Sequence, residues 1–272
     1  MLWLPLSLLV LSALAHASRL QPRIMGGRTA SKGEYPFVVY MHNGAEKTFC
    51  GGSIIGQQWI LTAAHCIKTA KANDITVYVG QYNYNLDPSK ATQVAKVVVH
   101  PQYNDNSMVN DIAMLQLSTN ITWSDSVQPI DIDTASIGDG IQVTALGWGF
   151  TSPTGKSASK DLKEGPLTTQ SVAQCGKKDT QFNGNNGKRI CVAGDTGTDT
   201  CPGDSGGPLI RQVNGKNMLL GITSFGTAGP GASITVNCGG AGMVSLFTHA
   251  NAFLSYIQTT TRSIDSSGKV IG

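Results

Sequence analysis

Hydrophobic and polar residues alternate along this chain in short runs, and most of the runs are rich in β-branched side chains. Alternation with a period of two over a few residues is typical of half-buried β-strands. Clusters of Gly, Asn, Asp, Pro and Ser, which favour turns, separate the runs. The pattern predicts short strands at 37–40, 53–55, 59–61, 75–79, 94–99, 112–117, 142–146 and 218–222.

One segment near the end of the chain has helical spacing instead. Within 251–259, Phe253, Leu254 and Ile257 recur at intervals that place them on one side of an α-helix. Many short strands with a single helix are typical of all-β barrels and sandwiches. The pattern therefore predicts an all-β fold with a short C-terminal helix.

The first residues differ in character from the rest. Residues 2–15 form a nearly unbroken apolar run, and Ala-His-Ala at 15–17 fits a signal-peptidase site, although no Lys or Arg precedes the run. The run is shorter than the roughly 20 residues of a membrane span, and no later segment qualifies. We predict a signal peptide at 1–17, secretion to the extracellular space, and no membrane association afterwards. An uncleaved anchor and a buried helix are the alternatives.

The charge balance argues against some classes of partner. The chain of 272 residues has 20 basic and 17 acidic residues, and removal of residues 1–23 takes away Arg19 and Arg23, leaving 18 basic residues. So small a net charge gives no electrostatic reason to expect nucleic acid or an anionic membrane as partner. The remaining length suffices for a large core in one or two domains.

Six cysteines in a secreted chain suggest three disulfides, for which sequence alone allows 15 connectivities. No His or Cys cluster has zinc-ligand spacing, and His42, His100 and His249 are expected to be structural or solvated. Asn120 opens an Asn-Ile-Thr tripeptide, which is either an N-glycosylation site or a chance occurrence in a loop.

The polar segment 199–208 carries a candidate nucleophile, Ser205. A serine hydroxyl is a poor nucleophile unless a base removes its proton, and that base must be held in the right tautomer by an acceptor. The chain offers both partners: His65 closes a predicted strand, and Asp111 opens another. Taken singly, each of the three also has an ordinary structural interpretation.

The segments around these residues resemble the chymotrypsin/trypsin family of serine endopeptidases. They are Thr-Ala-Ala-His-Cys at 62–66, Asn-Asp-Ile-Ala-Met-Leu at 110–115 and Gly-Asp-Ser-Gly-Gly-Pro at 203–208. The order His, Asp, Ser along the chain is also that family's, whereas subtilisins and α/β-hydrolases use other orders. The resemblance extends from residue 24 to about residue 257, nearly the whole mature chain.

The resemblance implies two antiparallel six-stranded β-barrels with the active site in the cleft between them. We expect the peptidase domain at 24–272, with the first barrel at 24–130 and the second barrel, C-terminal helix and tail at 131–272. His65 and Asp111 would come from the first barrel and Ser205 from the second. The implied disulfides are Cys50–Cys66, Cys175–Cys191 and Cys201–Cys238.

The family's mechanism, the standard worked example of a catalytic triad, implies a role for each residue. Ser205 attacks the scissile carbonyl, His65 acts as general base and then acid, and Asp111 orients His65. The backbone N–H groups of Gly203 and Ser205 would form the oxyanion hole. Gly203 suits this role because a residue without Cβ lets the backbone turn its N–H towards the ligand. The implied protein is a monomer without cofactor that acts on polypeptides and is open to protein protease inhibitors.

The N-terminal segment resembles the family's zymogen activation site. Residues 18–23 would be an activation propeptide, and cleavage after Arg23 would free the α-ammonium of Ile24 to pair with Asp204. A buried carboxylate needs such a partner. The pairing would draw the N–H of Gly203 into the oxyanion hole, so activity would wait on proteolysis. The alternative is an uncleaved N-terminal strand.

Substrate choice is implied by Asp199, because the family places the residue six before the nucleophile at the base of the primary specificity pocket. An Asp there is the trypsin arrangement and predicts cleavage after Arg or Lys, since an apolar side chain would leave the carboxylate unpaired. Arg23 would then itself be a substrate, which allows self-activation.

Other pocket positions depart from trypsin. Phe225 replaces the usual Trp in a segment whose backbone would pair with substrate, and the loop at 227–237 is longer. Ser245 falls where trypsin has a second pocket glycine, unless a register shift of three puts Gly242 there. Chymotrypsin-like, elastase-like or mixed preferences therefore stay open. The implied substrate-binding residues are Asp199, Thr200, Ser224, Phe225, Gly226 and Ser245.

The segment that corresponds to the family's calcium loop, 80–90, has Gln81 in place of the first acidic ligand and Asp87 as its only carboxylate. We therefore predict no calcium there, since calcium requires several oxygen ligands with carboxylates among them. Two alternatives for the function stay open: a protease-fold binding protein without catalysis, and an enzyme whose substrate is a single zymogen or receptor.

Overall fold

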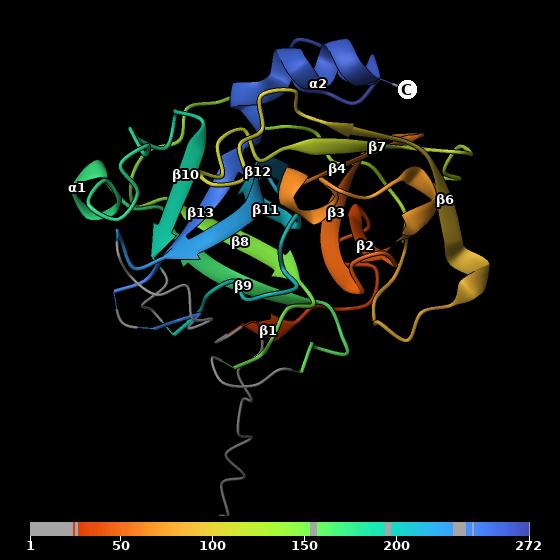
Figure 1. Cartoon of the computed structure of the whole chain (residues 1–272), viewed down its shortest axis with the longest axis horizontal. Helices are drawn as coiled ribbons and strands as arrows, with labels where there is room; N and C mark the ends of the chain where they lie inside the picture. Colours follow the sequence, from red (N-terminus) through yellow and green to blue (C-terminus); the bar gives the residue numbers. More distant parts are fainter. Residues whose placement is uncertain are drawn as a thin grey trace, which may run out of the picture.

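The computed structural model describes residues 24, 27–152, 157–193, 197–230, 238–240 and 242–271. Within these residues the fold is mostly β, with two bodies of strands side by side and one helix across an end of both (Figure 1). The all-β prediction is confirmed. The predicted signal peptide at 1–17, the propeptide at 18–23 and Arg23 lie outside the described residues.

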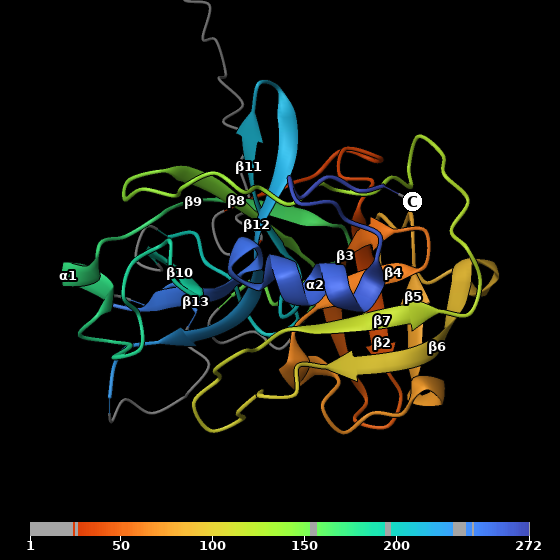
Figure 2. The same ribbon diagram turned by 90° about the horizontal axis from the view of Figure 1, so that it is seen from above.

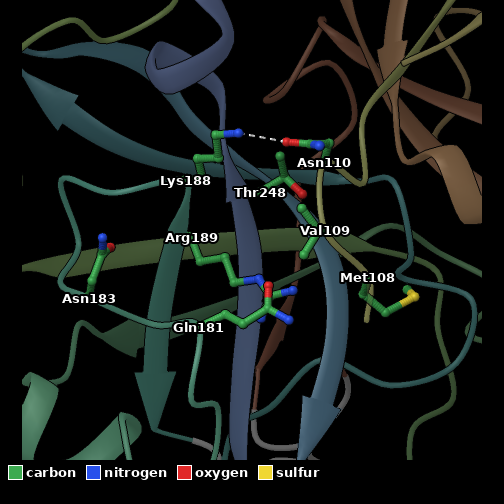
Figure 3. A pocket seen from close by; sticks show the side chains of 8 residues that line it. All are labelled: Met108, Val109, Asn110, Gln181, Asn183, Lys188, Arg189 and Thr248. Carbon is green, nitrogen blue, oxygen red and sulfur yellow. Dashed lines mark hydrogen bonds between the residues drawn. The ribbon is translucent and has the colours of Figure 1, made fainter. Parts of the chain in front are cut away.

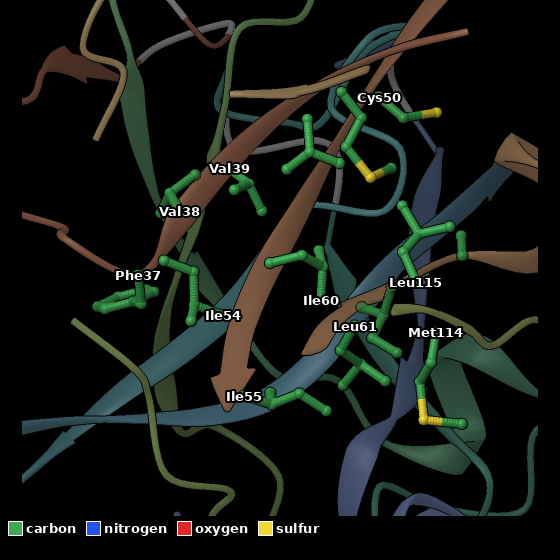
Figure 4. Close-up of a cluster of buried hydrophobic side chains, with 14 of the residues drawn as sticks. Phe37, Val38, Val39, Cys50, Ile54, Ile55, Ile60, Leu61, Met114 and Leu115 are labelled. Carbon is green, nitrogen blue, oxygen red and sulfur yellow. The ribbon is translucent and has the colours of Figure 1, made fainter. Parts of the chain in front are cut away.

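The first body is a closed antiparallel barrel with the strand order β2-β3-β4-β7-β6-β5. Ile60 and Leu61 pair with Leu115 and Met114, and these four side chains and Ile54 are fully buried in one hydrophobic cluster (Figure 4). Burial of each such side chain stabilises the fold by about 1.5–3 kcal/mol. The strands are β2 (Val38–Asn43), β3 (Thr48–Gly56), β4 (Trp59–Thr62), β5 (Ile75–Tyr78), β6 (Ala91–Val99) and β7 (Ala113–Leu117).

The second body is a sheet with the order β1-β9-β8-β11-β12-β13-β10. It differs in detail from the predicted six-stranded barrel, because it has seven strands and a single bridge, Thr169–Val192, in place of a closing ladder. β1 pairs with the start of β9, so only the end of β9 reaches β10. The strands are β1 (Arg28–Thr29), β8 (Gln142–Gly147), β9 (Lys163–Thr168), β10 (Arg189–Ala193), β11 (Pro208–Val213), β12 (Lys216–Thr227) and β13 (Val244–His249).

The predicted terminal helix is confirmed as α2 (Leu254–Thr261), which follows a 3₁₀ turn, η4 (Ala250–Phe253). Phe253 and Ile257 are buried in the same hydrophobic cluster as the first-barrel core, so the end of the chain packs back over the first barrel (Figure 2). A second helix, α1 (Val172–Cys175), is a single short turn. No helix in the described part of the chain is long and apolar enough to cross a membrane.

Three disulfides join the pairs that the resemblance implied. Two of them close loops of similar size, and the third ties the segment that contains the candidate nucleophile to the residues after 237. A disulfide across a loop of about 15 residues stabilises a fold by roughly 3 kcal/mol through the unfolded state. The pairs are Cys50–Cys66, Cys175–Cys191 and Cys201–Cys238.

Candidate active site

His65 and Asp111 lie together in the first barrel. His65 is in the 3₁₀ turn that follows β4, and Asp111 lies two residues before β7, the neighbour of β4. The imidazole Nδ1 lies 2.8 Å from Asp111 Oδ2, and the backbone N–H of His65 donates to Oδ1 at 2.9 Å. These two contacts fix both the place and the tautomer of the ring, so Nε2 is left to accept a proton.

Asp111 is fully buried, and its hydrogen bonds keep it ionised. Burial by itself would raise the pKa of the carboxyl, but the hydrogen bond and charge of His65 and a hydrogen bond from Ser224 together lower that pKa. Ser224 Oγ donates to Asp111 Oδ2 at 2.5 Å. Thr248 on β13 donates to the Asp111 carbonyl at 2.8 Å, and this residue carries no sequence signal, since Thr is ordinary in a strand.

Ser205 lies in the loop before β11, and this loop packs directly against the first barrel. The N–H of Gly51 donates to the Ser205 carbonyl at 2.8 Å. Gly206 has φ of 76°, and a Cβ there would lie 2.5 Å from the Gly51 carbonyl oxygen and collide with Thr62 Oγ1. Only glycine at 206 permits the loop to approach the first barrel this closely. The approach brings Ser205 near Thr62 at the end of β4, and His65 follows Thr62 closely in the sequence.

The hydroxyl of Ser205 makes no hydrogen bond to any described residue, and the structure does not join it to His65. The Nε2 of His65 has Cys66 Sγ as its neighbour, at 3.8 Å. Catalytic hydrogen bonds in uncomplexed enzymes are often long and tighten only when substrate binds. The arrangement therefore provides an oriented imidazole and a nearby hydroxyl, with the proton-transfer contact between them unformed.

The backbone beside Ser205 offers free donors. Gly203 has φ of 98°, and a Cβ there would lie 2.5 Å from the Phe49 ring, so the position requires glycine. Within the described residues, neither the N–H of Gly203 nor that of Ser205 donates a hydrogen bond, whereas the N–H of Asp204 between them donates to Cys201 at 2.9 Å. Two such donors can bind an oxyanion.

Asp204 is fully buried, in a space that two glycines leave open: a Cβ at Gly147 or Gly149 would collide with its carboxylate. Its oxygens accept from the N–H groups of Gly149 at 2.7 Å and Cys201 at 2.8 Å. Burial, with a smaller contribution from the charge of Asp199, raises the pKa of the carboxyl to about 7. Within the described chain no basic group pairs with Asp204.

Ile24 is fully buried, although it is only the first described residue. The missing side chain of Gly165 makes room for it, since a Cβ there would lie 2.9 Å from Ile24 Cγ2 and equally close to Thr198. In the uncleaved chain Ile24 therefore already packs against Gly165 on β9, near Thr198, which precedes Asp199.

Asp199 is buried and held by the pocket around it. Its Oδ1 accepts from the N–H of Thr200 at 2.8 Å and from Ser245 Oγ at 2.5 Å, and its Oδ2 accepts from the N–H of Gly239 at 2.8 Å. Thr200 Oγ1 also donates to Ser245 Oγ at 3.2 Å. The structure therefore puts Ser245, rather than Gly242, against Asp199.

The neighbouring strand completes this pocket. Gly226 on β12 pairs with Ser245 on β13, and a Cβ at Gly226 would meet Met243 at 3.6 Å, which is ordinary contact. Phe225 is half-buried and packs on the cluster around the Cys175–Cys191 disulfide. Most of the long loop at 227–237 lies outside the described residues.

The remaining candidate positions have other partners. His249 Nδ1 lies 2.8 Å from the Gly187 carbonyl, and burial lowers the pKa of this imidazole. His65, Cys50 and Cys66 lie close together, but the two cysteines form a disulfide and are not metal ligands. In the predicted calcium-free loop, Gln81 donates to the carbonyls of Asn83 at 2.6 Å and Asn85 at 3.1 Å.

A model of the family described as Trypsin matches residues 24–247 of this chain. The chain belongs to the trypsin family. Brachyurin of Leptuca pugilator is 35% identical over 246 residues, which cover 88% of this chain and 98% of that protein. Chymotrypsin-like elastase family member 1 of Macaca fascicularis is 31% identical over 250 residues, covering 89% and 90%. Trypsin 5G1 of Aedes aegypti is 32% identical over 214 residues, covering 78% of each.

Membership of the trypsin family makes this protein a serine endopeptidase, so its substrates are polypeptides. The names of the relatives span trypsin, elastase and brachyurin, and they do not decide which peptide bonds this member cleaves.

Proposed function

We propose that this trypsin-family protein is a secreted endopeptidase that cleaves after Arg or Lys and is made as a zymogen. The observation that carries the substrate preference is the buried carboxylate of Asp199, which accepts hydrogen bonds from Thr200, Gly239 and Ser245. A buried negative charge recognises a cationic side chain and rejects an apolar one, which would desolvate it without pairing.

We assign the chemistry to Ser205, His65 and Asp111. His65 takes the proton of Ser205 Oγ as that oxygen attacks the scissile carbonyl, and Asp111 stabilises the imidazolium that forms. The N–H groups of Gly203 and Ser205 bind the oxyanion, each supplying roughly 2.7–4 kcal/mol of transition-state stabilisation. His65 then protonates the leaving amine, and water repeats the sequence on the acyl-enzyme.

A second preference has an observation in its favour. Ser245 Oγ donates to Asp199 Oδ1 at 2.5 Å, so a residue of the pocket already supplies the carboxylate with a hydrogen-bond donor. The Ser245 side chain also narrows the base of the pocket. This contact lowers the penalty for an apolar substrate side chain and favours mixed specificity. The test is a peptide panel that varies only the residue before the scissile bond among Arg, Lys, Phe, Leu and Ala. Turnover of Leu or Phe above Arg would contradict the assignment to basic residues.

We propose that cleavage after Arg23 activates the enzyme, since Asp204 is a buried carboxyl that lacks a basic partner within the described chain and Ile24 is already buried. The Arg23→Gln precursor is expected to stay inactive on prolonged incubation with trypsin or with mature enzyme, while wild-type precursor gains activity. Peptide hydrolysis and N-terminal sequencing are the measurements. Full maturation of the variant at residue 24 would contradict the proposal.

The Asp204 carboxyl also predicts how activation changes stability with pH. In the precursor its folded pKa, about 7, exceeds that of an exposed carboxyl, so the precursor loses stability as pH rises from about 4 to 7. In the mature form the Ile24 ammonium would pair with the carboxylate and remove this loss.

On a Ser205→Ala background, which prevents self-cleavage, mature protein should therefore gain about 4 kcal/mol over precursor between pH 4 and 7, or roughly 10 °C in Tm. Titratable groups with the same surroundings in precursor and mature protein contribute equally to both stabilities, so their contributions cancel in the difference. Thermal unfolding of the two forms at several pH values is the measurement. A difference in Tm that does not change with pH would contradict the pairing of Ile24 with Asp204.

We also propose secretion, which three disulfides support because they persist in oxidising compartments. Asn120 is exposed and so open to glycosylation, as its tripeptide predicts. We infer a monomer that protein protease inhibitors can block by entering the same cleft.

A further inference from the structure

A buried ion pair lies outside the residues assigned to catalysis. Arg189 opens β10 and Asp179 lies in the loop after α1, and each is only 8% exposed. Arg189 Nη1 contacts Asp179 Oδ2, and Asp179 Oδ1 accepts from the N–H of Gln181 at 3.1 Å. Burial of two charges is costly unless their other hydrogen bonds are also made, so the remaining contacts of Arg189 are informative.

The second contact of Arg189 holds the segment that leads to Asp111. Arg189 Nη2 donates to the Ser107 carbonyl at 2.6 Å, and Lys188 Nζ donates to Asn110 Oδ1 at 2.9 Å (Figure 3). Two consecutive basic residues therefore tie both ends of the segment 107–110.

The backbone between these ties has an unusual conformation. Met108 and Asn110 have φ of 53° and 55°, a left-handed region that side chains other than glycine rarely adopt. Asn tolerates this region better than Met does. The segment thus depends on contacts from β10 to keep its shape, and it borders a hollow of about 110 Å³ lined by Met108, Gln181 and Thr248 among others.

The third contact of Arg189 is with Phe225. The guanidinium carbon lies 5.1 Å from the centroid of the Phe225 ring, which is cation–π distance. One guanidinium therefore joins the Asp179 loop, the Ser107 carbonyl and the aromatic side chain of β12.

We propose that Arg189 is a positioning residue for the substrate residues that precede the one in the specificity pocket. The inference rests on the proposed function and on the family resemblance, which implies that the substrate backbone pairs antiparallel with the segment 224–226. Ser224 is bound to Asp111, so the substrate residue at the scissile bond lies at that end, and earlier residues run past Phe225. Since side chains alternate along a strand, every second one faces the ring that Arg189 holds.

The test compares two substrates with the same basic residue: a single-residue ester and a tetrapeptide amide. The ratio of their kcat/KM values is the gain from substrate length. The variant is the double substitution Arg189→Met with Asp179→Leu, which removes both charges so that neither is left buried alone. The matched control is Arg211→Met with Asp133→Leu. It removes an ion pair with a 2.5 Å contact between β11 and the segment before β8, in which Asp133 is buried and Arg211 is partly buried.

We expect the Arg189/Asp179 variant to lose about tenfold or more of the gain from length, mainly through KM, because the Phe225 ring loses its cation–π partner, whereas Lys188 still holds Asn110 beside Asp111. The ester hydrolysis of the Arg189/Asp179 variant should stay within about twofold of wild type. The length gain of the Arg211/Asp133 control should also stay within about twofold of the wild-type length gain. An unchanged length gain in the first variant, or an equal loss in the control, would overturn the proposal. Absence of ester hydrolysis in wild type would instead refute the proposed function.

If the double variant does not fold, two milder changes give the answer. Arg189→Lys keeps a cation beside Phe225 but lacks the planar fork that reaches Asp179 and Ser107 together, and it should lose part of the length gain. Phe225→Leu should lose a comparable part of the length gain. The variant that combines Arg189→Lys with Phe225→Leu should lose less of the length gain than the product of the two separate fold-losses. Independent effects of the two substitutions would overturn the proposal.

Discussion

Replacement of Ser205 by alanine is expected to lower kcat by about 10⁵-fold to 10⁶-fold in the mature enzyme. The loss has this size because the nucleophile and its base act as a unit, and His65 has nothing to deprotonate once the hydroxyl is gone. The free N–H groups of Gly203 and residue 205 would still bind an oxyanion, so a residual rate above that of water should remain. Burst and steady-state kinetics on a basic peptide amide are the measurement.

The substitution should leave the fold unchanged, since the Ser205 hydroxyl makes no hydrogen bond to the described residues. Thermal unfolding therefore serves as its control, together with Ser267→Ala, a change to an exposed serine whose hydroxyl bonds only Asp265 nearby in the chain. The Ser267 variant should keep full activity. Hydrolysis by Ser205→Ala within tenfold of wild type would contradict the assignment of the nucleophile.

Replacement of Asp199 by serine is expected to lower kcat/KM for Arg and Lys substrates by about 10⁴-fold, because the cationic side chain would enter a buried pocket with no counter-charge. Turnover of Phe or Leu substrates should stay equal or rise, since the variant removes the carboxylate that an apolar group leaves unpaired. The peptide panel described above, measured with wild type and with the variant, gives kcat/KM for the basic and for the apolar substrates.

Ser245→Gly is the matched control for the pocket, because it removes the hydroxyl that donates to Asp199 but keeps the carboxylate. It should preserve the preference for basic residues and sharpen it against Phe and Leu. A uniform loss over all five substrates in Asp199→Ser would indicate a folding defect rather than lost recognition. Unchanged cleavage after Arg would contradict the role of Asp199.

The strands that hydrophobic alternation predicted all overlap observed strands, but β1, β9, β10, β11 and β13 were missed, four of them for identifiable reasons. β9 contains Gly165 and Pro166, which read as a turn, and β11 begins with Pro208. β13 is buried along its whole length, so its polar residues sit inside and break the alternation. The two-residue β1 is a strand only because the edge of β9 pairs with it.

The residues of the candidate site also differ in whether the sequence alone could predict their roles. His65, Asp111 and Ser205 were recognised from local motifs, and the cysteine pairs followed from the resemblance. The structure confirms the cysteine pairs and places His65 beside Asp111. The contact between Ser245 and Asp199 depends on the register of β13 against β12, which no local pattern fixes. The role inferred for Arg189 depends on three segments far apart in the chain, and a single basic residue at the start of a strand gives no sign of it.

We propose that His65 activates Ser205 once the chain is cleaved. The most direct test of this proposal is labelling of the activated protein with a fluorophosphonate, followed by mass mapping of the labelled peptide. We expect one label per molecule, on Ser205, and little labelling of either the uncleaved precursor or a His65→Ala variant. Label on another residue, or equal labelling of the His65→Ala variant, would contradict the account.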